Sequence, residues 1–166
     1  MRLAALALFL ALAAVAPALA SPTACAILRT GDVERAVGRV TMVKGGPLAD
    51  CGGTCDGGTR SYCSFRIDGG GITDVTVLLS LPPYRAAEDA WRATMRAALA
   101  AHHTLGIRDV PDLGDAAFWT FHDRQGDLAV FRAGLYHLII QTNGSSSEDV
   151  SDKVAEALGR CALQRL

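Results

Sequence analysis

The chain has 166 residues, with 16 Lys and Arg against 17 Asp and Glu and a formal net charge of −1. This length is enough for one domain with its own hydrophobic core. The near-neutral balance gives no long-range attraction to nucleic acid or to anionic lipid, so nucleic acid is not expected as a partner.

The first twenty residues predict a secretory signal peptide. One arginine is followed by an unbroken apolar run over residues 3–15, and small residues end the segment at Ala20. That run is too short to span a membrane, which takes about 20 residues. A lipoprotein signal ending at Cys25 would need an apolar residue where Pro22 stands. We therefore expect cleavage after Ala20, a single secreted domain over residues 21–166, and a periplasmic or extracellular location, with no membrane span.

The first half of this domain predicts one helix and three strands. The helix ends at Gly38, a residue that suits the left-handed end of a helix. Apolar residues alternate along the last of the three strands, which places Val75, Val77 and Leu79 on one face. The expected elements are a helix over 31–38 and strands over 40–43, 62–67 and 73–81.

The second half predicts a long helix, three more strands and a closing helix. The long helix covers 84–103, where apolar residues recur at helical spacing, and the closing helix follows a cap at Ser146. The strands are expected over 116–122, 127–132 and 135–142. The resulting order is α-β-β-β-α-β-β-β-α. Because hairpins dominate, the order predicts the α+β class, an antiparallel sheet with packed helices.

Three of the five cysteines lie in the glycine-rich stretch CGGTCDGGTRSYC, residues 51–63. A zinc site needs two close pairs of ligands and a redox site needs Cys-x-x-Cys, whereas three residues separate Cys51 from Cys55. Disulfides are favoured, because glycine loses the most conformational freedom when a loop is ordered and cross-links offset that loss. No metal and no cofactor are expected. Spacing alone leaves the pairing open.

Two histidines and one tryptophan are the candidates for a functional surface. His122 and His137 lie in neighbouring predicted strands and could meet across a hairpin, where they would form a metal or acid–base site. Phe118 and Trp119 are consecutive in a predicted strand and point to opposite faces. One of them is therefore expected to face solvent, and an exposed Trp119 would mark a binding surface. No catalytic motif is present, so no catalytic residue is assigned.

Several segments together resemble a group of small secreted bacterial domains of unknown function. They are CAILRTGDVERAVG, YCSF, VPDLGDAAFW and LAVFRAGLYHLIIQ, followed by a closing amphipathic helix. The resemblance implies the open antiparallel sandwich of the photosystem II extrinsic protein PsbP and its relatives, in a secreted setting and with no implied activity. The chain departs from the pattern in the inserted CGGTCDGGTR and in Cys161.

The same resemblance implies a pairing of the cysteines. It favours a disulfide Cys25–Cys63, which would leave Cys51–Cys55 to close the inserted loop and Cys161 as a free thiol. The rival pairing is Cys25–Cys161 with Cys51–Cys63.

The sequence is interpreted as a disulfide-stapled accessory or binding module, monomeric and non-enzymatic, with an unknown protein or small ligand as its partner. The alternative is a metal-handling protein or small enzyme that uses His122, His137 and the loop cysteines.

Overall fold

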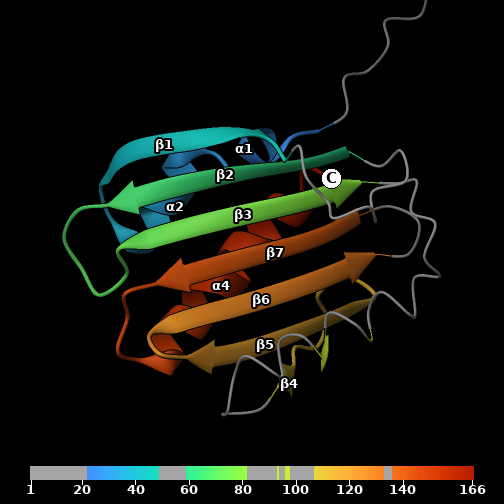
Figure 1. Ribbon diagram of the computed structural model, residues 1–166. Helices are drawn as coiled ribbons and strands as arrows, with labels where there is room; N and C mark the ends of the chain where they lie inside the picture. The colour runs from blue at the N-terminus through green and yellow to red at the C-terminus, as the bar shows by residue number, and fades with distance from the viewer. Residues whose placement is uncertain (1–21, 49–58, 82–92, 94–95, 98–106, 133–135) are drawn as a thin grey trace, which may run out of the picture.

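The computed structural model describes residues 22–48, 59–81, 93, 96–97, 107–132 and 136–166. Its centre is a seven-stranded sheet in the order β1-β2-β3-β7-β6-β5-β4, in which all neighbouring strands are antiparallel (Figure 1). The strands are β1 (Val40–Pro47), β2 (Thr59–Ile67), β3 (Asp74–Leu81), β4 (Arg108–Asp109), β5 (Ala116–His122), β6 (Gln125–Arg132) and β7 (Tyr136–Asn143). The helices outside the sheet are α1 (Ala24–Ile27), α2 (Thr30–Val37) and α4 (Glu148–Leu163).

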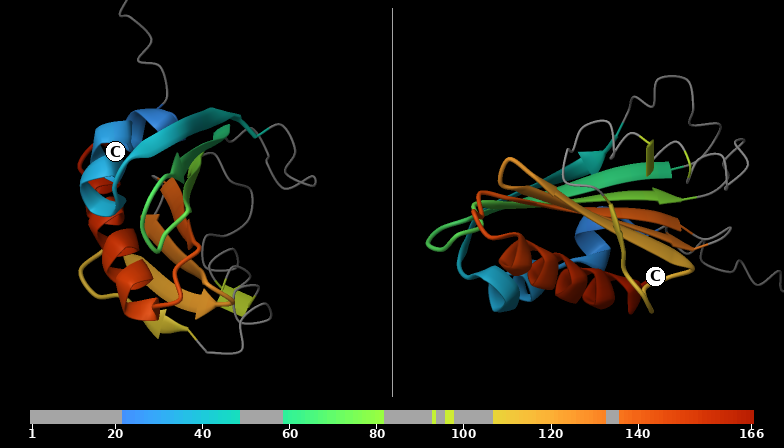
Figure 2. Two further views of the ribbon diagram at one scale, coloured as in Figure 1. Left: turned by 90° about the vertical axis from the view of Figure 1, so that its left-hand side faces the viewer. Right: turned by 90° about the horizontal axis from the view of Figure 1, so that it is seen from below.

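These three helices lie on one face of the sheet, which we call the helix face (Figure 2). The opposite side is called the far face. Helix α4 packs on β6 and β7, while α1 and α2 pack at the β1–β3 end of the sheet. Gly159 of α4 lets the helix approach closely, because a Cβ there would lie 3.1 Å from the side chain of Leu128. In the described part of the chain, no helix is both long and apolar enough to cross a membrane.

Alternate residues of the strands form the core against the helices. The predicted apolar face of β3 is confirmed, because Val75, Val77 and Leu79 are buried on the helix face and Leu81 is half-buried. The neighbouring strands contribute residues at matching register positions. Large side chains of this core are Phe65, Trp119, Leu128, Leu138, Ile140 and, from α4, Leu158.

The α+β class and the antiparallel sheet with packed helices are as predicted, but the predicted element order is not reproduced. Two short helices rather than one precede β1, because residues 24–27 form a helical turn of their own. Four residues are too few for hydrophobic periodicity to reveal a helix. The two-residue β4 also stands before β5. The helix expected over 84–103 lies outside the described residues, except for Ala93, Arg96 and Ala97, which are helical.

A disulfide joins Cys25 of α1 to Cys63 of β2, with their Cα atoms 5.0 Å apart. This is the pairing that the resemblance favoured over Cys25–Cys161. Gly45 of β1 lies opposite Cys63, and a Cβ at that position would clash with the Cys25 sulfur. Cys161 is a free, half-buried thiol on α4. Cys51 and Cys55 lie outside the described residues, as does the predicted signal peptide.

Candidate functional site

Trp119 does not mark an exposed surface. Its side chain is 1% exposed and lies in the main core, on the helix face. The indole lies against Gly126 of β6, where a Cβ would overlap the ring. The expectation of an exposed tryptophan is therefore wrong, because the side chain fills the space that glycine leaves on the neighbouring strand.

Phe118 points to the far face, as alternation requires, but it is also buried, at 6% exposed. It belongs to a small second cluster with Ala129 and Phe131, and the two phenylalanine rings have centroids 5.4 Å apart. The Arg96 guanidinium lies over the Phe118 ring, with its carbon 4.8 Å from the ring centroid. Neither aromatic residue is the solvent-facing one that the sequence suggested.

His122 and His137 do not meet. His122 ends β5 and pairs in register with Gln125, which in turn pairs with Asn143 at the end of β7. His137 lies near the start of β7, so the two histidines stand at opposite ends of the sheet with β6 between their strands. The imidazole Nε2 of His122 instead lies 2.7 Å from the carboxylate of Asp123.

The prediction that the two histidines form a metal or acid–base site is therefore wrong. The residues that the structure describes contain no group of three or more His, Cys, Asp or Glu side chains placed to hold a metal ion. Cys63, the loop cysteine that is described, is held in a disulfide.

The far face instead carries a continuous arrangement of polar side chains that we call the polar band. It consists of two adjacent rows that cross six strands, with residues matched by their register. Eleven of its twelve side chains are polar, so this pattern is a property of the face and not of one strand. The first row is Lys44, Ser64, Thr76, Gln141, Asp127 and Thr120, and the second is Met42, Arg66, Asp74, Asn143, Gln125 and His122.

Hydrogen bonds between neighbouring strands, and within β6, hold the side chains of the polar band. The hydroxyls of Ser64 and Thr76 are 3.0 Å apart. On the next strands, the amide of Gln141 donates to the Asp127 carboxylate at 2.9 Å, and the Gln125 amide donates to the same carboxylate at 3.0 and 3.1 Å. Such bonds reduce the rotamer freedom that a ligand would otherwise have to remove.

Exposure changes along the polar band. Asp127 and Thr120 are buried, at 2% and 1% exposed. Thr76 and Gln141 are half-buried, and Lys44 at the β1 end is exposed. The first row is therefore accessible from β1 to β7 and closed on β6 and β5, whereas Gln125 and His122 of the second row are half-buried.

A groove of about 310 Å³ lies at the accessible end of the band. The guanidinium of Arg66 is oriented there by Asp74, whose carboxylate accepts from its Nε at 3.2 Å. Lys44 has no acidic partner among the described residues. The groove thus offers one guanidinium paired with the Asp74 carboxylate, one ammonium and the Ser64 hydroxyl. Its lining residues are Met42, Lys44, Ser64, Arg66 and Asp74.

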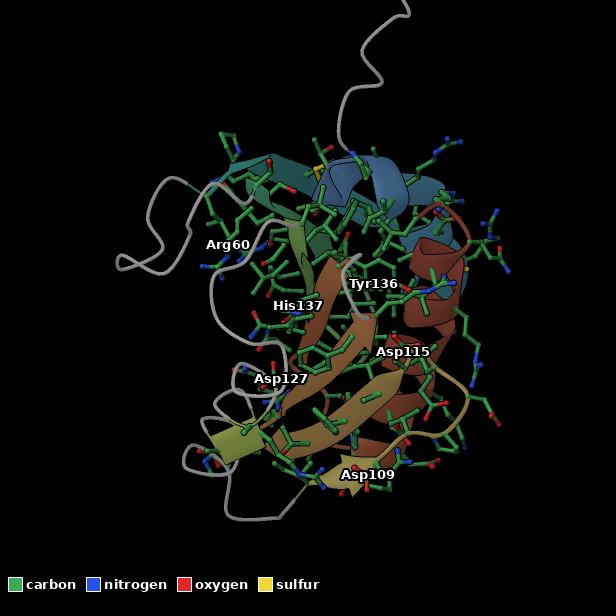
Figure 3. The ribbon with its side chains drawn as sticks, turned by 90° about the vertical axis from the view of Figure 1, so that its right-hand side faces the viewer. Arg60, Asp109, Asp115, Asp127, Tyr136 and His137 are labelled. Carbon is green, nitrogen blue, oxygen red and sulfur yellow. A yellow bond between two sulfur atoms is a disulfide. The ribbon has the colours of Figure 1, made fainter. Side chains whose placement is uncertain are left out.

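The rest of the far face is more apolar. The row beside the band is Tyr62, Leu78, Ile139, Ala129 and Phe118. Beyond it, Arg60 donates from Nε to the Ser80 hydroxyl at 3.2 Å, and Ser80 pairs in register with His137. Figure 3 shows Arg60, His137 and Asp127 together on the side of the sheet away from the helices. His137 is buried against Phe131, with ring centroids 5.1 Å apart.

The strongest ionic contacts lie on the helix side, away from the polar band. The Asp32 carboxylate, 3% exposed, is bound by both terminal nitrogens of Arg165 at 2.5 and 3.1 Å, by Arg35 and by the backbone N–H of Arg29 at 3.0 Å. The hydrogen bonds from Arg165 are the main reason that the pKa of Asp32 lies below its usual value. This contact ties the end of the chain to α2 and is structural.

A second ionic contact joins the sheet edge to α4. Arg108 of β4 lies 2.6 Å from Asp152 and 3.6 Å from Glu156. Burial raises the pKa of Asp152, although Arg108 opposes that change. Burial also raises the pKa of Tyr136, which lies toward the helix side in Figure 3. None of these groups faces the groove.

Comparisons with known proteins add little to this picture. No family model matches the chain, and no curated protein matches it. A solved structure described as a GTP binding regulator from Thermotoga maritima is similar, with 14% identity, a TM-score of 0.45, and coverage of 81% of this chain and 84% of that chain. Similarity at this level leaves the function to be argued from the residues of the chain itself.

Proposed function

We propose that this protein is an exported, disulfide-stapled binding module with a PsbP-like sandwich, and that the polar band is its ligand-binding surface. The polar band is the observation that carries the proposal. A sheet face covered only to exclude water would be apolar, as the helix face is, since an unsatisfied buried polar group is costly. In ligand sites, a small number of placed polar groups fix the orientation of the ligand and the specificity for it.

Export rests on separate grounds. The first twenty residues have the pattern of a cleaved leader. The Cys25–Cys63 disulfide suits an oxidising compartment, because cytosolic thiols are kept reduced. Intact-mass analysis of protein from the producing cell should show a chain that starts at Ser21. A mass that retains the leader would contradict cleavage, and a diacylglyceryl group on Cys25 would indicate a lipoprotein.

Binding can be tested before the ligand is known. Native mass spectrometry of the protein purified from its own compartment should show a non-covalent adduct. The double variant Lys44→Gln/Arg66→Gln should lose the adduct, because both side chains line the groove. The control Lys153→Gln removes one positive charge from exposed α4 on the other side of the sheet and should keep the adduct. An adduct retained by the groove variant would place the ligand elsewhere.

The alternative function, a metal-handling protein or small enzyme, finds less support. Its pair of histidines is separated across the sheet. We also propose that the module acts as a monomer and without a cofactor.

A further inference from the structure

The chemistry of the polar band narrows the class of ligand. Amides and hydroxyls both donate and accept hydrogen bonds, whereas Arg and Lys only donate and carboxylates only accept. The accessible part of the band presents all three kinds side by side, from Lys44 and Arg66 to Asp74, Thr76 and Gln141. A ligand that matches them must itself carry many groups that donate and accept.

The accessible part also has a direction. It crosses β1, β2, β3 and β7, which at about 4.8 Å between strands is roughly 14 Å. Charge is concentrated at the β1 end, where Lys44 has no acidic partner in the described structure. Apart from Asp74, whose carboxylate pairs with Arg66, the side chains toward β7 are neutral hydroxyls and amides, namely Thr76, Gln141 and Asn143. An elongated ligand with an acidic group at one end and hydroxyls along its length fits this order.

Other classes fit less well. An extended peptide would add to the edge of a sheet through its backbone, and an amphipathic helix would need an apolar groove. Nucleic acid would need a large excess of positive charge, whereas the chain has a formal net charge of −1. A small oxyanion alone would use Lys44 and Arg66 and would leave the amides unused.

We infer that the polar band binds an acidic saccharide, with its carboxylate at Lys44 and Arg66 and its hydroxyls along Ser64, Thr76 and Gln141. This inference rests on the proposed function, since it names the ligand class of the same surface. The apolar contact that a sugar ring also needs is offered by Met42, which lines the groove and is 49% exposed.

Isothermal titration calorimetry with a galacturonate trimer tests the inference, with maltotriose as the neutral trimer of the same length. The acidic trimer should bind at least about tenfold more tightly, because a charge-assisted hydrogen bond contributes enough for about that factor. Lys44→Gln and Arg66→Gln should each weaken the acidic trimer by about tenfold, and Lys153→Gln should leave its affinity unchanged. Thr76→Val, which removes a hydroxyl from the middle of the band, should weaken both trimers.

The outcomes separate the inference from the proposed function. Equal binding of the two trimers would overturn the acidic part, and competition by inorganic phosphate as strong as that of the trimer would reduce the site to an anion site. Binding of neither trimer by a protein whose native adduct depends on Lys44 and Arg66 would overturn the saccharide and leave the proposed function standing. A native adduct that the groove variants do not affect would overturn both.

Discussion

The helix face and the far face of the sheet are supplied by alternate residues of the same strands, yet they meet different surroundings. On the helix face, Val77 lies between buried apolar residues of the two neighbouring strands and is covered by the helices. It is therefore fully buried. One position earlier, Thr76 faces the other way, is half-buried and bonds to Ser64. A single strand thus contributes to a core on one side and to a polar surface on the other.

The far face itself changes character from row to row. The polar band occupies two rows, and the next row, from Tyr62 to Phe118, is largely apolar. Each residue in a row comes from a different strand, and β3 and β7 are distant in the sequence, so one polar residue on one strand would not produce the band. Variants on the helix face should therefore change mainly stability, and variants on the far face should change mainly ligand binding.

The largest effect is expected from Trp119→Ala on the helix face. Truncating a fully buried tryptophan leaves a large cavity and should lower the free energy of unfolding by about 4 kcal/mol, measured by urea denaturation. Trp119→Phe should cost far less, because it keeps most of the ring and removes an indole N–H that has no partner among the described residues. Gly126→Ala should also destabilise, since its Cβ would overlap the indole. A neutral Gly126→Ala would show that the ring is not seated there.

Sequence patterns predicted the strands well because alternation is a local signal. The strand expected over 116–122 is β5 itself, and the closing helix begins one residue later than a cap at Ser146 would place it, since Ser147 accepts from the Val150 N–H. The pattern did not decide which of Phe118 and Trp119 faces the helices, because both are large and apolar. That choice depends on Gly126, which only the register of β6 places under the indole.

The candidate site was harder to predict because it depends on long-range register. Thr76 and Gln141 become neighbours only when β3 pairs with β7, which the order of elements in the sequence does not indicate. The alternation of Arg60, Ser64 and Arg66 with apolar residues was a visible signal of a polar face, though not of a site. The expectation that His122 and His137 meet was avoidable, because successive hairpins place the end of one strand beside the start of the next. His122 ends β5 and His137 lies near the start of β7, so two hairpins place them at opposite ends of the sheet.

Loss of the disulfide is expected to be nearly as costly as loss of the tryptophan. Cys25 and Cys63 are separated by 38 positions, and opening a loop of that length should lower the stability by about 4 kcal/mol in the chain-entropy model. Thermal denaturation of Cys25→Ser/Cys63→Ser measures the effect. Cys51→Ser/Cys55→Ser should cost about 2 kcal/mol at most if those residues close their own short loop. The reverse order would contradict the view of Cys25–Cys63 as the main staple.

The Asp32 contact should make stability depend on acidity. Its pKa is lower in the folded state than the usual value near 4, so the stabilisation is present above that value and is lost as the pH falls through the folded pKa. At pH 7, Arg165→Ala should lower the stability, because it leaves the Asp32 carboxylate without its main partner. The difference between wild type and Asp32→Asn should shrink steadily below pH 4. A difference that stays constant down to pH 2 would rule out the ion pair as its source.

The smallest and most direct test compares the two neighbours on β3. Val77→Ala removes apolar volume from the helix face and should cost about 2 kcal/mol, with no effect on the affinity for a ligand of the polar band. Thr76→Ala removes one half-buried hydroxyl and should cost about 1 kcal/mol or less, but it should weaken that ligand. Because the two residues share a strand, a general loosening of β3 would affect stability and binding together in both variants. If Val77→Ala lowered the affinity for the ligand as much as Thr76→Ala did, binding on the far face would depend on the core beneath it. The assignment of stability to one face and of binding to the other would then be wrong.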